Sequence, residues 1–421
     1  MAVANLLRRR CCTSLPFATV VLVLGFCSSH VSLALAAARS KVEYLPGFGP
    51  LPFELETGYI GIGESEDVQL FYYFVKSESN HNVDPIMLWI SGGPGCSSLF
   101  ALTQELGPLL FDLPKNNGAL PTLSLNPYSW TKWLADHLEY QSNSFYVGGD
   151  SFSGVTVPMV VNAISYGINI GLNPHIDLKG YFVGNAFTYP IGYIIQMTRG
   201  LDLIPDEIYK SYQECGGNLI CLLNFLKIGQ LTLVNFPQNI LETNCFGRNE
   251  IGASYGQSSV AKRFRGFNVH ALDPFFLCKG QELISLWAND DSVQEALHIR
   301  KGSIEKWVQC RDDLPFNRTV LDSRPYYAIL SMKGYRSLIY SGDHDLFVCS
   351  LSTEAWTKSL GYSIIDDWRP WFMNNQIVGY TRTFSNNMTY AKIKGSGHIA
   401  PVYTPLECFI MFKRWISYEK L

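Results

Sequence analysis

Short apolar runs that end in glycine-rich turns recur along the chain, and they constrain its fold more than any other feature. Residues 68–75 and 85–90 have the composition of strands, the second fully apolar like an interior strand. Further strand-to-loop transitions lie at 145–149, 178–185, 335–343 and 390–398, and helical segments at 97–106, 154–168 and 404–416. Strands that alternate with helices predict an α/β fold with a mainly parallel central sheet.

The N-terminus has the features of a targeting segment. Three arginines at 8–10 precede an apolar run at 15–26, and small residues at 34–38 offer a cleavage site. This order predicts a secretory signal peptide over residues 1–38. An uncleaved membrane anchor is the alternative, although the apolar run is short for a membrane span. We therefore expect a protein of the secretory pathway, in the vacuole or outside the cell, with no stable membrane span after signal removal.

Composition and charge narrow the classes of partner. The 421 residues are 47% hydrophobic and 16% charged, a composition that can bury a large core. The formal net charge is −3 and no basic block occurs in the body of the chain, so we expect no nucleic-acid partner. No internal repeat is visible.

Cysteine usage agrees with an oxidising compartment. Of eleven cysteines, Cys11, Cys12 and Cys27 fall within the predicted signal peptide. The others show no CxxC pairing, which argues against a zinc site, so we expect disulfides and no metal. Glycosylation sequons begin at Asn317 and Asn387 and support the same compartment.

Residues 201–285 differ from the segments on either side of them. They contain four cysteines, few strong strand signals and irregular loops. We interpret them as a lid insertion between a first core part, 39–200, and a second core part, 286–421. An ordinary loop-rich region is the alternative.

A serine stands where the strand at 145–149 meets the helix at 154–168, in the stretch GGDSFSG. In an open parallel sheet, ligands bind beyond the carboxyl ends of the strands, and a serine on a sharp turn there points into that crevice. The usual nucleophile elbow reads G-x-S-x-G, whereas here Ser153 holds the last position and Gly154 follows. On this motif alone, a turn with an N-capping Asp150 or Ser151 is an equally good interpretation.

Two later segments supply the partners that a nucleophilic Ser151 needs. A serine hydroxyl requires a base to take its proton, and a carboxylate to hold that base in the right tautomer. Acids follow the strand in LIYSGDHDLFV, and His398 ends the last strand in a glycine-rich turn. The order serine, acid, histidine is that of α/β-hydrolases.

An acyl-transfer site also needs hydrogen-bond donors for the oxyanion. Gly92 and Gly93 come directly after the strand at 85–90, where side chains would block a close approach of the backbone. The N–H groups of Gly93 and Phe152 are therefore the candidate donors. A plain Gly-Pro turn is the alternative.

These pieces together resemble the serine carboxypeptidase family, and most closely the plant serine carboxypeptidase-like proteins. The matching stretches cover most of the chain from about residue 42 onward: ETGYIGIGE, FYYFVKSE, GGPGCSS, NPYSWTK, GGDSFSG, SGDHDL and GHIAPVYTPLECFIMFKRWI. The resemblance implies an α/β-hydrolase fold with a helical, disulfide-stapled lid insertion. By motif position it assigns these roles: nucleophile Ser151, base His398, acid Asp345 with Asp343 as fallback, and oxyanion donors Gly93 and Phe152.

The resemblance also implies disulfide pairings. These are Cys96–Cys310, Cys245–Cys278 and, in the lid, Cys215–Cys221. Cys408 on the final helix is expected to be a buried free thiol, whereas Cys349 stands where the family usually has another residue. Ile399 and Val402, beside the base, also depart from the family, which commonly has threonine and glutamate there.

The residues for substrate recognition favour acyl transfer. Peptidase members usually bind the substrate's terminal carboxylate through an asparagine before GGPG, a glutamate before the serine and a further glutamate. Here Ser91 and Asp150 hold the first two positions, while Glu105 is kept. Gly92 is a further candidate substrate-binding residue. Because Ser91 is too short to replace the amide, we expect an acyltransferase that uses 1-O-acyl glucose esters in plant secondary metabolism, with a serine-type carboxypeptidase as the alternative. The partners are then a small-molecule acyl donor and acceptor, or a peptide C-terminus, and no cofactor is implied.

One core strand is missing after Lys132. There the family normally has a buried strand, a loop of the type DSPVGxGFSY and most of a helix, whereas this chain continues with WLADHLEYQSNSFYVGG. The segment between the strands at 85–90 and 145–149 suffices for one right-handed crossover and no extra strand. Each buried backbone group that loses its partner costs about 1–3 kcal/mol. A catalytically impaired isoform, from alternative splicing or gene misprediction, is therefore a further alternative.

Overall fold

The structure is a computed structural model, which describes residues 39–62, 68–77, 84–112, 119–133, 143–172, 176–189, 193–215, 223–224, 226–229, 235–236, 238–243, 276–311 and 319–421. The predicted signal peptide lies outside these residues. The chain divides into two units, Met1–Arg39 with Gly58–Tyr72, and Ser40–Thr57 with Tyr73–Leu421. In the first unit the rings of Tyr59 and Phe71 lie 4.8 Å apart.

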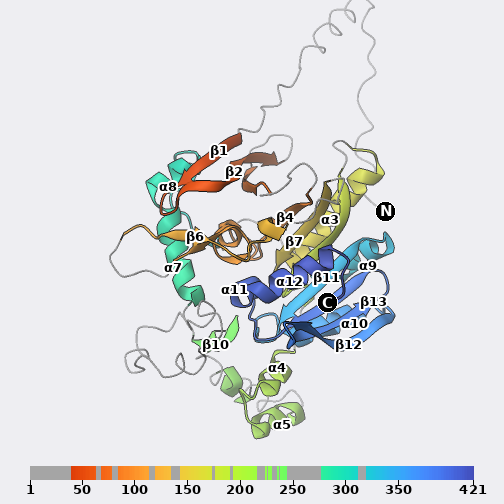
Figure 1. Cartoon of the computed structure of the whole chain (residues 1–421). Helices are drawn as coiled ribbons and strands as arrows, with labels where there is room; N and C mark the ends of the chain where they lie inside the picture. Colours follow the sequence, from red (N-terminus) through yellow and green to blue (C-terminus); the bar gives the residue numbers. More distant parts are fainter. Residues whose placement is uncertain are drawn as a thin grey trace, which may run out of the picture. The chain divides into compact units, whose positions relative to one another are not determined.

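A seven-stranded sheet, in the order β12-β13-β14-β11-β8-β7-β4, forms the centre of this unit (Figure 1). Its parallel strands are β4 (Ile86–Ile90), β7 (Ser144–Asp150), β8 (Asp177–Gly184), β11 (Arg336–Gly342) and β14 (Met388–Ile393). The mainly parallel α/β sheet predicted from the apolar runs is confirmed. An antiparallel hairpin of β12 (Ile364–Met373) and β13 (Gln376–Phe384) extends it and has no counterpart among the predicted elements.

Helices bury both faces of the sheet, which explains why its inner strands are almost wholly apolar. Val157 and Val161 of α3 (Ser153–Asn169) pack in one core cluster with Ile339 of β11, together with α9 (Arg324–Met332) and α10 (Ser350–Ser359). In another cluster, α12 (Pro405–Ile416) packs against β8 and β11. There Phe412 stacks on Trp130 with ring centroids 4.2 Å apart.

Strand β4 is the edge of the sheet, so the prediction of an interior strand at 85–90 is wrong. Among the described residues it pairs only with β7, and Leu88 is 40% exposed. β3 (Val68–Val75) belongs instead to a separate sheet with β1 (Arg39–Leu45) and β2 (Gly49–Ile62). The composition of β4 is that of a strand with neighbours on both sides. Its open side agrees with a core strand missing after Lys132.

Short elements complete the described chain. A π-helical turn, η1 (Ala101–Glu105), lies in the predicted helix at 97–106, and the small pair β5 (Leu109–Phe111) and β6 (Leu123–Leu125) precedes α2 (Trp130–Trp133). Helix α4 (Ile194–Gly200) ends just before the predicted lid. The lid contains α5 (Asp206–Glu214), β9 (Asn235–Phe236), β10 (Asn239–Thr243) and most of α7 (Phe276–Ala288), and α8 (Asp291–Ala296) follows it. The domain boundaries themselves stay predictions.

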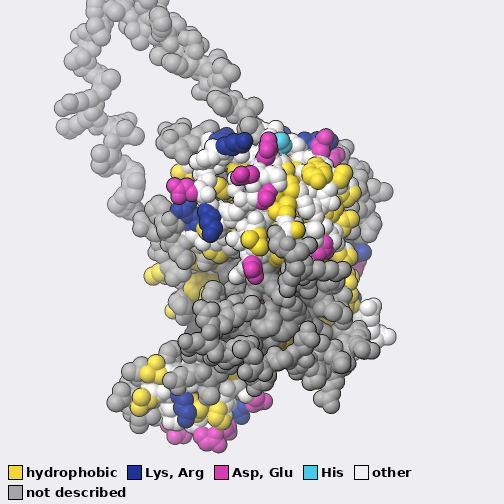
Figure 2. Space-filling model, turned by 90° about the vertical axis from the view of Figure 1, so that its left-hand side faces the viewer, with side chains coloured by type: hydrophobic (Ala, Val, Ile, Leu, Met, Phe, Trp, Pro, Cys, Tyr) yellow, Lys and Arg dark blue, Asp and Glu magenta, His cyan; other side chains and the backbone are white. Residues whose placement is uncertain are grey.

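The described surface and helices show two further properties. On the face in Figure 2, the described acidic and basic side chains are interspersed. Within the described ranges, every helix is too short or too polar to span a bilayer.

Candidate active site

Ser151 occupies a strained turn between β7 and α3. Its φ is 57°, in the left-handed region that non-glycine residues rarely adopt. The turn is fixed by backbone hydrogen bonds: Ser151 donates to the Gly184 carbonyl at 2.9 Å, and its own carbonyl accepts from Gly154 at 3.0 Å and Phe187 at 2.9 Å. The N-cap of α3 is Phe152, without a side-chain capping bond, so the interpretation as a turn capped by Asp150 or Ser151 is wrong. The conformation is that of a nucleophile elbow.

The glycine turn after β4 packs directly against this elbow. A Cβ on Gly92 would lie 2.7 Å from the Cβ of Ser151 and 3.0 Å from the Phe152 nitrogen, so only glycine fits. Gly93 follows with a φ of +120°, again a glycine conformation. The structure thus brings the two segments that carry the predicted oxyanion donors, Gly93 and Phe152, into contact.

His398 and Asp345 form a buried pair. The Nδ1 atom of His398 lies 2.7 Å from Oδ2 of Asp345, and the two side chains are 4% and 0% exposed. The other carboxylate oxygen accepts from the N–H groups of Phe347 at 2.7 Å and Val348 at 3.1 Å. Burial works to lower the pKa of His398, but the charge and hydrogen bond of Asp345 raise it above its ordinary value. Such a pair holds the imidazole in one tautomer, with Nε2 left to accept a proton.

The fallback acid, Asp343, is directed elsewhere. Its Oδ1 accepts from the N–H of Gly395 at 2.7 Å, and no hydrogen bond joins it to His398 among the described residues. Of the two acids in the SGDHDL stretch, the geometry selects Asp345.

Asn185 is a site residue that the sequence interpretation missed. Its amide nitrogen donates to Asp345 Oδ2 at 2.7 Å, the oxygen that also faces His398. The side-chain oxygen accepts from Gly342 N–H at 3.3 Å, and the backbone N–H donates to the Tyr340 carbonyl at 2.8 Å. Its φ of 41° suits asparagine, which tolerates the left-handed region. An asparagine at the end of a predicted strand was the available signal.

Two buried acids lie beside the elbow. The carboxylate of Asp150 accepts from Gly92 N–H at 3.1 Å, and the side chain of Glu105 in η1 is near enough for the two charges to interact. Burial raises the pKa of Glu105 well above its ordinary value, and the charge of Asp150 raises it further. Burial also raises the pKa of Asp150, against the opposing charge of His398. Ser151 N–H donates to the Gly184 carbonyl, and the next residue, Asn185, donates to Asp345, so hydrogen bonds connect the elbow to the His398–Asp345 pair.

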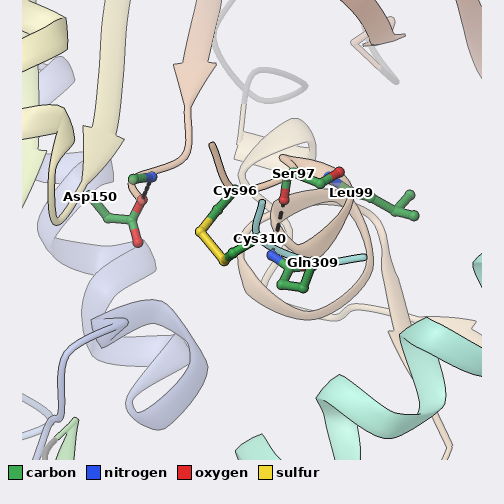
Figure 3. The surroundings of a disulfide bond; sticks show 7 residues. Cys96, Ser97, Leu99, Asp150, Gln309 and Cys310 are labelled. Atoms are coloured by element: carbon green, nitrogen blue, oxygen red, sulfur yellow. Dashed lines mark hydrogen bonds between the residues drawn. A yellow bond between two sulfur atoms is a disulfide. The ribbon is translucent and has the colours of Figure 1, made fainter. Parts of the chain in front are cut away.

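The turn that carries Gly93 is tied to a distant segment (Figure 3). Cys96 and Cys310 form a disulfide across a sequence separation of 214 residues, the pairing that the resemblance implied. Around it, Ser97 N–H donates to the Gln309 carbonyl at 2.7 Å, and Arg311 N–H donates to the Gly95 carbonyl at 3.0 Å. The turn after β4 that carries Gly93, the donor turn, is therefore held by a covalent bond and by a short antiparallel bridge.

Part of the predicted lid touches the loops of the His–Asp pair. The N–H of His398 donates to the Gln238 carbonyl at 2.6 Å, and Ile240 of β10 donates to the His344 carbonyl at 3.1 Å. The ring of Phe347 meets the His398 imidazole edge-on at 5.2 Å.

The remaining predicted residues are placed as follows. Ser91 has a buried hydroxyl with no hydrogen-bond partner in the described part of the chain. Cys349 and Cys408 are both free and buried, and Asn387 is exposed in the turn between β13 and β14. Cys215 is disulfide-bonded, but Cys221 and Cys245, the side chain of Cys278, and Asn317 lie outside the described residues. Those pairings stay predictions.

Comparisons with known proteins agree with this architecture. The chain is 43% identical to serine carboxypeptidase-like 11 of Arabidopsis thaliana over 456 residues, covering 96% of this chain and 98% of that protein. It is 38% identical to serine carboxypeptidase-like 17 of the same plant, covering 95% and 98%. Among solved structures, the prohormone-processing carboxypeptidase Kex1 of Saccharomyces cerevisiae matches with a TM-score of 0.65 at 18% identity, covering 90% of this chain and 95% of that one.

The same comparisons show where the chain departs from its relatives. The first alignment, 456 residues, is longer than the 421-residue chain, so the relative carries residues without a counterpart here. The serine carboxypeptidase family model matches in two segments, 46–134 and 131–418, which meet where the strand was predicted to be absent. Together these two segments span nearly the whole chain, which therefore belongs to the serine carboxypeptidase family.

Proposed function

We propose that this protein transfers acyl groups from 1-O-acyl glucose esters to an alcohol through an acyl-enzyme on Ser151. The observation that carries the chemistry is the 2.7 Å contact between His398 and Asp345 beside the strained elbow. His398 takes the proton of the serine hydroxyl while Oγ bonds to the ester carbonyl carbon, and the N–H groups of Gly93 and Phe152 stabilise the oxyanion. The bond to glucose then breaks, and His398 returns the proton to the departing oxygen. In the second half of the reaction, His398 takes the proton of the acceptor hydroxyl while its oxygen bonds to the acyl carbonyl carbon. The bond between that carbon and Ser151 Oγ then breaks, and His398 returns the proton to Oγ.

The recognition residues support a sugar ester over a peptide. A terminal carboxylate needs hydrogen-bond donors, and Ser91 offers one short hydroxyl in place of an amide. The carboxyl groups of Glu105 and Asp150 also have oxygens that can accept hydrogen bonds from sugar hydroxyls. Glu105 Oε1 is buried with no hydrogen-bond partner in the described part of the chain, so a substrate hydroxyl could satisfy it.

An experiment with two substrates tests the proposal. The mature chain is given a fluorophosphonate probe, and labelling that disappears in Ser151→Ala identifies the nucleophile. The enzyme then receives either an acyl glucose with an alcohol acceptor, or an N-blocked dipeptide. New ester supports the proposal, whereas release of the terminal amino acid alone supports the carboxypeptidase alternative.

Because β4 pairs on one side only within the described part of the chain, an impaired isoform is a second candidate. A chain that folds but takes no label at Ser151 would support it. Transcript sequencing that reads continuously across codons 132 and 133 would count against a splicing or annotation origin of the gap. We also propose that the chain is made in the secretory pathway and glycosylated at Asn317 and Asn387, which enzymatic deglycosylation of the secreted protein would test.

A further inference from the structure

Asp343, which the catalytic geometry leaves unused, lines a hollow outside the His–Asp pair. The hollow has a volume of about 310 Å³, and its wall includes Trp368 of β12, Tyr380 of β13, and Lys392 and Lys394 at the end of β14. Neither Ser151 nor His398 contributes to it. Its volume is at the low end for ligand pockets, which fits one small ring and not a chain of them.

One wall of the hollow is aromatic. The rings of Trp368 and Tyr380 stack with centroids 5.5 Å apart and an angle of 10° between their planes. Trp368 also stacks on Tyr390, with ring centroids 6.0 Å apart. Tyr380 is 36% exposed and lines the hollow. A preformed aromatic surface of this kind can take the apolar face of a ring-shaped ligand without reordering side chains.

Polar groups of both kinds stand beside that surface. The Lys392 ammonium lies 5.6 Å from the Trp368 ring centroid. Lys392 and Lys394 line the hollow, and the charge of Lys392 also acts on Asp343, whose Oδ1 lies 3.8 Å from Nε2 of His344. Both ammonium groups can donate to a ligand. The carboxylate of Asp343 only accepts, and one of its oxygens already binds Gly395 N–H at 2.7 Å.

We propose that this hollow binds a single pyranose ring. A pyranose has an apolar C–H face that can lie on Tyr380, and its hydroxyls can donate to Asp343 and accept from the two lysines. An aromatic carboxylate could also stack and bind the lysines, but it would bring its negative charge to Asp343. The hollow therefore suits a neutral ring with many hydroxyls better. The inference is independent of the proposed reaction, because the residues that it uses are not those of the catalytic site.

Sugar titrations of the mature chain test the proposal. Ser151 is first blocked with the fluorophosphonate, so that the catalytic pocket is occupied, and binding of glucose, galactose, mannose and benzoate is followed by saturation-transfer NMR. We expect saturable binding of at least one hexose. Tyr380→Ala should weaken it about tenfold or more, and Asp343→Asn and Lys392→Gln should also weaken it, while Tyr44→Ala, at an exposed tyrosine of β1, leaves it unchanged.

Three results would overturn the proposal: no hexose binds, benzoate alone binds, or hexose binding is equal in the parent protein and in both Tyr380→Ala and Lys392→Gln. Thermal unfolding by circular dichroism verifies that each variant is folded. A chain that does not take the serine label would contradict the proposed reaction alone, and the Tyr380 and Lys392 variants would still report on the hollow.

Discussion

Replacing Asn185 by alanine should slow the acylation of Ser151 while the chain still folds. The amide donates to Asp345 Oδ2 at 2.7 Å, the oxygen that also faces His398 Nδ1 at 2.7 Å. A hydrogen bond to a charged group contributes about 1.5–3 kcal/mol, which corresponds to a roughly 10- to 150-fold slower reaction if all of it is lost in the transition state. Without the amide, the carboxylate should also hold the imidazolium more strongly. The pH at which His398 becomes an active base should therefore rise.

A glycine variant at position 185 separates the loss of the amide from the strain of the backbone. Alanine in the left-handed conformation of Asn185, with a φ of 41°, costs about 1–2 kcal/mol, whereas glycine adopts it freely. Both Asn185→Ala and Asn185→Gly lose the amide, so Ser151 should be acylated slowly in both. The alanine variant should be less stable than the glycine variant by about 1 kcal/mol.

The assay is the rate constant for fluorophosphonate labelling over a series of pH values, with urea unfolding of each variant alongside. If both variants label at the parent rate and with the parent pH profile, the amide does not position the carboxylate and the reasoning is refuted. A loss of rate in the alanine variant only would assign the effect to backbone strain.

Three further predictions use the same preparations. Burial works to lower the pKa of His398, but Asp345 raises it above the ordinary 6.5, so labelling should fall as the pH drops through this raised value, and a flat profile between about pH 8 and 5 would contradict it. Burial raises the pKa of Glu105 well above 4.5, so above pH 4.5 the folded state keeps a proton that the unfolded chain releases. The free energy of unfolding should therefore fall as the pH rises from 4.5 to the raised pKa. Glu105→Gln should be more stable than the parent in urea at pH 7, with the difference gone below about pH 4; a difference that does not depend on pH would show that the Glu105 carboxyl is not its cause. Leu88→Lys puts a charge on β4, which pairs on one side only within the described residues, and should slow thermal aggregation several-fold as measured by light scattering. Leu125→Lys, at a similarly exposed leucine of β6, should not slow it. Equal effects of the two variants would show that β4 is not the aggregation site.

The parallel core was predictable because its strands are buried on both faces and therefore appear as apolar runs. The β12–β13 hairpin was not predictable in the same way. Its first strand, IIDDWRPWFM, carries acids, an arginine and Pro370, and several of its side chains are exposed. Such a strand is specified by its partner across the hairpin and not by its own periodicity.

The prediction of β4 as an interior strand was wrong because its apolar pattern was misleading. Its sequence has the apolar composition suited to strands on both sides, whereas the described residues supply a neighbour on one side only.

At the site, the serine, the histidine and the acids could be located because each ends a strand in a glycine-containing turn. The choice between Asp343 and Asp345 was less accessible to pattern alone. The two stand two residues apart, and only the positions of Gly395 and His398 in space distinguish them. Asn185 was missed because its partner, Asp345, is 160 residues away along the chain. Such a contact leaves no local periodicity in the sequence.

The bond between Cys96 and Cys310 gives the active site an order of assembly. The donor turn next to Ser151 cannot be locked until Cys310 has been synthesised, long after the elbow itself has been translated. It can be locked only where thiols are oxidised. A preparation from a reducing cytoplasm would therefore contain Ser151 and the His398–Asp345 pair, but backbone hydrogen bonds alone would hold its donor turn. The activity of such a preparation would depend on the expression host as well as on the amino-acid sequence.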